Sequence, residues 1–251
     1  MGYHLAAFSR SMTAASTDEQ INAVADGHLT VTANSMFQAQ TDLYVRAAYV
    51  MGTTITRARI SSPSLRAVNL PQIQPITRGV VVPTLPRLCQ YGDDMPKIAR
   101  LDEFVLQSSN AAAGAEQHTG FLFLSYDRAE APVGPTFTCR ATSTITLVAN
   151  GWANGVLTME QQLPPGRYAC IGLTGFGNDC IAARLIPVDG GPRPGCLMLD
   201  TIAGDDFQHA RFGKLGKLLE FEHTALPLLE IFGEAAGAES PEVHMDLIKI
   251  R

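Results

Sequence analysis

Residues 137–147 read Phe-Thr-Cys-Arg-Ala-Thr-Ser-Thr-Ile-Thr-Leu. In an extended chain one face carries mainly apolar side chains, from Phe137, Cys139, Ala141, Ile145 and Leu147. The other face carries mainly threonine, which favours strands because its side chain is β-branched. This period of two predicts a half-buried β-strand.

The same period continues through most of the chain. It predicts further strands at 28–33, 42–51, 53–60 and 243–250. In the last of these the alternation slips at Leu247-Ile248, which suggests a bulge. Two other runs, 121–124 and 169–171, are apolar on both faces, as expected where a second layer or a neighbouring subunit covers the sheet.

Two short segments carry helix signals instead. Ser16 followed by Glu19 has the spacing of a capping box, with an apolar face after it and Gly27 as a stop. Pro227 opens a helical turn that Gly233 closes, which predicts a second helix over 227–232. The first of these helices is expected to be peripheral.

Short strands separated by frequent proline and glycine turns predict a mainly β fold. We expect an antiparallel jelly-roll sandwich, either single with insertions or double, with a few short helices. We expect an arm with a short helix over 1–27. An Ala-, Gly- and Ser-rich stretch at 108–120 then suggests a boundary between two β-rich halves, at 28–110 and 119–251. One continuous domain is the alternative, and no sequence repeat relates the halves.

The overall composition limits the possible partners. Charged residues make up 17% of the 251 residues, against about 25% in an ordinary globular protein, so some surface is expected to face a partner. A net charge of -5 excludes a protein that wraps nucleic acid through overall positive charge. The beginning of the chain lacks the long apolar stretch of a signal peptide, so we expect synthesis in a host cytoplasm.

The motifs of catalysis are missing from the sequence. It has no nucleophile elbow, P-loop, zinc-protease helix or dinucleotide turn. The five cysteines form no close pair and are expected to be free and buried. His209 and His223 flank charged residues and Asp205-Asp206 is acidic, but a solvated charged face is the simpler interpretation of both. We therefore expect no enzyme activity, no metal and no cofactor.

Charge is distributed unevenly along the chain. Between Leu43 and Gly92 there is no acidic residue, whereas from Asp189 onward eleven acidic residues face six basic ones. The candidate subunit-interface residues are the arginines of the first stretch: Arg46, Arg57, Arg59, Arg66, Arg78 and Arg87. Arginine is enriched at protein interfaces because its planar fork forms paired bonds. Contact with nucleic-acid or lipid phosphates, and ion pairs inside the subunit, are the alternatives.

Three segments resemble coat proteins of icosahedral viruses built from jelly rolls, including the double jelly-roll lineage of membrane-containing phages. They are residues 55–66, 163–168, and 183–186 with 193–195. The resemblance implies a major capsid protein that forms trimeric capsomers in an icosahedral shell. Its implied partners are further copies of itself, other virion proteins, and an inner membrane or genome phosphates at the arginine-rich stretch, and its implied location is the virion.

One feature departs from the coat proteins that condense their own genome, which carry a long basic arm. Residues 1–20 contain a single basic residue, Arg10. The resemblance therefore points to a shell that is filled by pumping or lined by a membrane.

Two other classes of function remain open. A ligand- or receptor-binding sandwich would need exposed aromatic side chains, and Trp152 is the single tryptophan. A jelly-roll enzyme would use His209, His223 and nearby carboxylates, since fold alone does not fix function.

Overall fold

The computed structural model describes residues 2–12, 15–66, 72–73, 89–91, 95–111, 116–126, 130–198 and 210–251. The chain divides into two compact units, one formed by Leu5–Tyr126 and one by Asp127–Arg251 together with Met1–His4. Both are built from antiparallel strands, and α1 (Pro63–Arg66) is the one helix in the described ranges. No helix there is long and apolar enough to cross a membrane.

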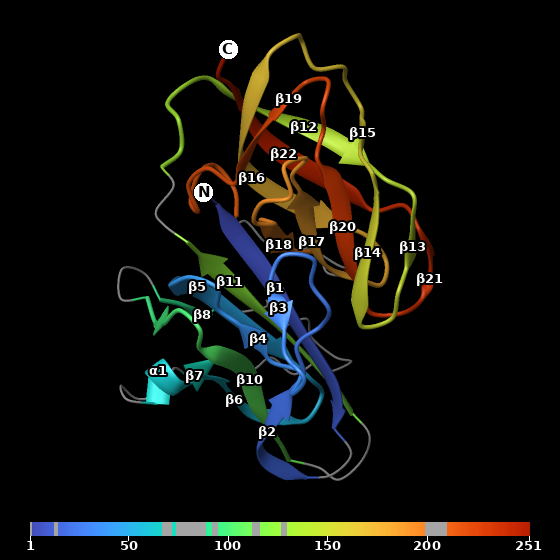
Figure 1. Ribbon diagram of the computed structural model, residues 1–251. Coiled ribbons are helices and arrows are strands. Elements are labelled where there is room, and N and C mark those ends of the chain that lie inside the picture. The colour runs from blue at the N-terminus through green and yellow to red at the C-terminus, as the bar shows by residue number, and fades with distance from the viewer. Residues whose placement is uncertain are drawn as a thin grey trace. The chain divides into compact units, whose positions relative to one another are not determined.

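The first unit is a sandwich of two sheets (Figure 1). One sheet has the order β1 (Tyr3–Met12), β11 (Glu116–Ser125), β5 (Leu43–Met51) and β8 (Cys89–Gln90), with β9 (Lys97–Ile98) also paired to β5. The other has the order β2 (Ser16–Ile21), β10 (Glu103–Asn110), β6 (Ile55–Ser61) and β7 (Gln72–Ile73). A hairpin of β3 (Thr30–Val31) and β4 (Phe37–Gln38) extends this second sheet at β10.

The second unit is also a sandwich. One sheet has the order β12 (Thr136–Thr142), β22 (Glu242–Lys249), β16 (Arg167–Phe176) and β19 (Leu219–Glu222), with β15 (Thr158–Met159) outside β12. The other has the order β14 (Gly151–Val156), β20 (Leu228–Gly233), β17 (Cys180–Ile186) and β18 (Gly195–Leu197). A small pair joins β13 (Ile145–Leu147) to β21 (Gly237–Glu239).

The two units share one topology. The eight main strands are β1, β2, β5, β6, β7, β8, β10 and β11 in the first unit, and β12, β14, β16, β17, β18, β19, β20 and β22 in the second. When they are numbered one to eight in chain order, the order in one sheet of each unit is first, eighth, third, sixth. In the other sheet it is second, seventh, fourth, fifth. This order, in which the chain crosses repeatedly between two antiparallel sheets, is that of a jelly roll. The protein therefore contains two jelly rolls in succession, which resolves the choice between a single and a double sandwich.

Each sandwich has its own apolar core. In the first unit Phe37 contacts Phe8 and Phe104, with ring centroids 5.2 and 5.7 Å apart. The core of the second unit includes Leu173 and Leu247 from one sheet, Leu185 and Ile231 from the other, and Leu147 from the small pair.

Several sequence predictions are confirmed. The strands predicted at 42–51 and 53–60 are β5 and β6, and the segment 137–147 forms β12 and β13 with a break at Ser143-Thr144. The runs that are apolar on both faces lie in β11 and β16 and are buried on both sides. Of the strand predicted at 28–33, only Thr30–Val31 is extended into a ladder.

Both predicted helices are wrong. Residues 16–21 form β2, in which Ile21 is buried opposite Leu106, so tertiary pairing overrides the local capping signal. Residues 228–233 form β20, where Leu229 and Ile231 enter the core. Leu228 and Phe232 on its other face are apolar as well, and this hides the strand period in the sequence.

The alternation slips at Leu247-Ile248 because Leu247 lies in the main core and Ile248 packs in a second apolar cluster with Ala169 and Ile171. The bulge itself lies on the neighbouring strand. Cys170 pairs with Leu247 and Gly172 with Asp246, so the extra residue is Ile171 of β16. Strand β22 pairs with β12 without interruption.

The boundary predicted at 108–120 can be compared with the division between the two units. The stretch 108–120 contains the end of β10 and the beginning of β11, both in the first unit. The division between the units follows β11, between Tyr126 and Asp127.

Candidate functional site

Two of the six candidate interface arginines form ion pairs inside the first jelly roll. Arg57 and Arg59 lie on the outward face of β6. The alternating residues Ala58 and Ile60 point the other way, into the core. Both guanidinium groups bind the carboxylate of Asp18 on β2, at 2.7 and 2.9 Å. Arg59 also donates a hydrogen bond to Gln107. These arginines therefore connect β6 to strands of their own sheet.

The other candidate arginines are not gathered beside them. Arg46 lies on the opposite sheet, where it is the extra residue of a bulge in β5 and donates to the sulfur of Met95 at 3.0 Å. Arg66 is exposed at the end of α1. Arg78 and Arg87 lie outside the described residues. The described arginines of this stretch are thus divided among separate places in the sandwich.

A buried charge cluster lies in the second jelly roll. The Nε of Arg184 on β17 donates to Glu230 on β20 at 2.6 Å, and Arg193 binds the same carboxylate at 3.1 Å. Arg184 is fully buried, and its guanidinium carbon lies 3.9 Å from the ring centre of Trp152. Trp152 also packs edge-on against Phe232. One face of the single tryptophan is therefore occupied by a cation from its own sandwich.

A second buried carboxylate, Asp246 on β22, is held by several donors. Arg211 reaches it at 2.6 and 2.8 Å, the backbone N–H of Phe212 at 3.0 Å and the hydroxyl of Thr138 at 2.7 Å. Burial by itself raises the pKa of Asp246. The donors together lower it by more, so the net pKa lies below the ordinary value. The group is an ionised anchor for the 211–212 segment.

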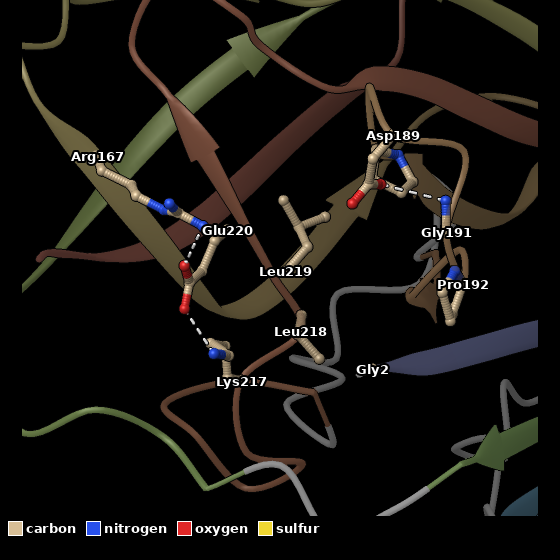
Figure 2. Close-up of a pocket in the computed structure, with 10 residues that line it drawn as sticks. Gly2, Arg167, Asp189, Gly191, Pro192, Lys217, Leu218, Leu219 and Glu220 are labelled. Atoms are coloured by element: carbon tan, nitrogen blue, oxygen red, sulfur yellow. Dashed lines mark hydrogen bonds and ion pairs between the residues drawn. The ribbon is translucent and has the colours of Figure 1, made fainter.

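A surface pocket of about 290 Å³ opens beside β19 in the second unit (Figure 2). Its charged side chains are already paired, because Glu220 binds Lys217 at 2.5 Å and Arg167 at 2.7 Å. These two cations, Lys217 first, hold the pKa of Glu220 below its usual value although partial burial opposes them. Asp189 accepts a hydrogen bond from the backbone of Gly191. The pocket wall is thus a set of satisfied polar groups.

One of the residues considered for catalysis, His223, has a structural contact. His223 accepts a hydrogen bond from the backbone N–H of Gly166, which fixes the turn before β16. His209, Asp205 and Asp206 lie outside the described residues. Among the residues that are described, no three His, Cys, Asp or Glu side chains gather closely enough to hold a metal ion.

The structure describes the side chains of four cysteines, Cys139, Cys170, Cys180 and Cys196, and these four are free and buried, as predicted. Burial raises the pKa of Cys170 to about 12 and also raises the pKa of Cys139 and Cys196. A thiol acts as a nucleophile in its deprotonated form, so these thiols are unreactive at neutral pH.

Sequence analysis missed a further polar cluster, around His118 in the first jelly roll. Ser108 and His118 are fully buried and lie 2.6 Å apart between Oγ and Nδ1. In the sequence these residues are polar positions within or next to apolar runs, and their partners come from other strands. No local pattern marks them.

Comparisons with known proteins give similarity to solved structures. No family model matches the chain, and no curated protein matches it. Among solved structures, the chain is similar to the major capsid protein P2 from bacteriophage PM2, with 9% sequence identity, 97% of each chain covered and a TM-score of 0.21. At this score the superposition carries no argument, and the functional inference rests on the topology of the two sandwiches.

Proposed function

We propose that the protein is a self-assembling structural subunit of a virion, a major capsid protein that forms trimeric capsomers in an icosahedral shell. The observation that carries this proposal is the repetition of the jelly-roll strand order in both units. Single jelly rolls occur in capsid proteins, lectins and cupins. Two in succession in one chain are what the resemblance to the double jelly-roll coat proteins implies.

The surface of the second sandwich supports a role in association. Val156 on β14 lies directly opposite Leu228 on β20, and both side chains are exposed. Val188, beyond the end of β17, is 74% exposed. Exposed apolar side chains are common one at a time, but neighbouring ones supply area for a partner to bury. In this proposal apolar burial drives assembly, and surface charges steer it.

The proposal assigns no enzyme activity and no cofactor to the chain. Support comes from the chemistry of the described side chains: the thiols are buried and protonated, and His223 serves a turn. A ligand-binding sandwich is the competing function. Against it, one face of Trp152 is covered by Arg184 and is not open to a sugar ring.

The first experiment measures assembly directly. Light-scattering mass after size exclusion, with negative-stain microscopy of the same fractions, is recorded at low and high salt. We expect trimers or closed shells that weaken as salt rises, because exposed charge pairs are screened. A compact monomer at every protein and salt concentration would contradict the proposal and favour the ligand-binding module.

A paired set of variants tests the arginines. In Arg57→Glu/Arg59→Glu both cations become anions, and we expect a large loss of particle yield if they contact a neighbouring subunit. Asp18→Asn is the matched control: it removes the pairing inside the unit but leaves both cations in place. Circular dichroism verifies the fold of each variant. Equal particle yield from the folded double variant would show that these arginines are not interface residues.

If the double variant and Asp18→Asn lose yield equally, the arginines act inside the subunit. In that case an inner membrane or genome phosphates would also lose support as partners of this face. Binding of the wild-type chain to anionic vesicles and to duplex DNA, measured against salt, examines those two partners separately.

A further inference from the structure

A polar cluster links the two sheets of the first jelly roll at one end of its core. His118 lies on β11 and Ser108 on β10, and these strands belong to different sheets. Both side chains point inward, since Ser108 pairs with the core residue Ala58 and His118 alternates with the core residue Leu122. The 2.6 Å hydrogen bond between Ser108 Oγ and His118 Nδ1 therefore connects sheet to sheet.

Glu116 ties the cluster to the turn that carries the chain from β5 to β6. Its carboxylate accepts hydrogen bonds from the backbone N–H and the hydroxyl of Thr54, and that hydroxyl also contacts Asn110. Glu116 Oε1 lies 3.7 Å from His118 Nε2. A Cβ at Gly52 would lie 2.7 Å from the ring of His118, so the turn approaches the ring closely because residue 52 has no side chain.

The electrostatics of this site disfavour a charged ring. Burial lowers the pKa of His118, whereas Glu116 and, more weakly, Glu19 of β2 raise it, and the net pKa lies below the ordinary 6.5. Glu19 is itself paired with Arg10 at 2.5 Å. Within the described residues, the Nε2 of His118 has no hydrogen-bond partner. In the folded protein the ring is therefore neutral at neutral pH.

We propose that this cluster is an acid-sensitive clasp, which holds the two sheets of the first jelly roll together while His118 is neutral and loosens when the ring gains a proton. Protonation would place a charge on the buried ring, next to a carboxylate whose oxygens are already bonded to Thr54. A serine-nucleophile role does not fit, because Ser108 is fully buried. The clasp concerns the stability of one sandwich and holds whether or not the chain assembles.

The direction of the pH effect follows from linkage. Because the pKa of His118 is lower in the folded chain than in the unfolded one, the unfolded state binds the proton more tightly. The stability that the neutral ring contributes to the fold is fully present above pH 6.5. It is lost as the pH falls from there toward the pKa of His118 in the folded chain. Ordinary carboxylates titrate near pH 4, below the pH at which this loss of stability begins.

Hydrogen exchange of the full-length chain at pH 7.5 and 5.5, corrected for intrinsic rates, tests the clasp. For amides of β10 and β11 we expect exchange to rise by up to about tenfold for each pH unit within the window, since one proton is linked to opening. Strands β16 and β22 of the second jelly roll serve as the internal reference. Equal protection of β10 and β11 at both pH values would overturn the proposal.

Variants separate the clasp from a purely structural role. His118→Gln should remove the pH response of β10 and β11, while the control His244→Gln, at a histidine that is 34% exposed, should keep it. Glu116→Gln should preserve or enlarge the response, because it removes the main charge that favours protonation. If His118→Gln does not fold, Glu116→Gln decides, and a response smaller than that of the wild type would overturn the proposal. A pH response that persists in folded His118→Gln would do the same.

Discussion

At the scale of single residues, the second jelly roll depends on charges placed inside it. Glu230 is held between Arg184 and Arg193, and Asp246 is held by Arg211. A buried carboxylate is tolerated only when cations and hydrogen-bond donors replace its hydration. Each of these carboxylates therefore fixes the relative position of the segments that donate to it.

We predict that Glu230→Gln destabilises the second jelly roll by about 3 kcal/mol. The change removes the negative charge but leaves the fully buried Arg184 in place, and a buried charge deprived of its counter-ion is costly. Denaturant unfolding followed by circular dichroism measures the loss.

The matched control is Glu160→Gln. Glu160 pairs with Arg140 at 3.4 Å, and both side chains are about half exposed. Pairs of this kind contribute at most about 1 kcal/mol. If the two variants lost the same stability, burial would not be the reason for the effect.

At the scale of elements, the two sheets of the first jelly roll approach closely at Gly120 of β11. A Cβ there would lie 2.4 Å from a methyl group of Leu106 on β10 and 3.1 Å from Val50 on β5. These neighbours are core side chains with no room to withdraw. The glycine sets how near the sheets lie at this point.

Gly120→Ala is accordingly expected to destabilise the first jelly roll by about 1–3 kcal/mol, the usual cost of overpacking. Thermal unfolding of the full chain provides the measurement. Gly237→Ala on β21 is the control, since a Cβ at Gly237 meets no atom within 4 Å. A neutral or stabilising effect of Gly120→Ala would show that the sheets can separate freely there.

At the scale of the whole molecule, the chain contains two sandwiches with separate apolar cores. Units with their own cores generally unfold as separate cooperative transitions. We therefore predict that the calorimetric enthalpy of unfolding exceeds the van't Hoff enthalpy, and that scanning calorimetry resolves two transitions.

The variants above assign these transitions. Glu230→Gln should lower the midpoint of one transition and Gly120→Ala that of the other. A single transition with equal enthalpies, shifted alike by both changes, would show that the two jelly rolls unfold as one cooperative unit.

The sequence by itself determined which segments are extended, because the strand period is written in neighbouring residues. Phe137–Leu147 shows it directly, and this segment forms β12 and β13. It misplaced helices at 16–26 and 227–232 for a related reason. A capping box is a local signal, and in β20 the alternation is hidden because Leu228 and Phe232, on the face opposite Leu229 and Ile231, are apolar as well.

The tertiary structure alone decided which strands are neighbours, and with them the double jelly roll. Two sandwiches of the same strand order arise from halves without a sequence repeat, because many sequences satisfy one pattern of buried faces. The same holds for the candidate sites. The arginines of 46–66 are divided between sheets, whereas Ser108 and His118 meet across a core. Such contacts depend on strand pairing over long sequence separations, which the local period of the chain does not encode.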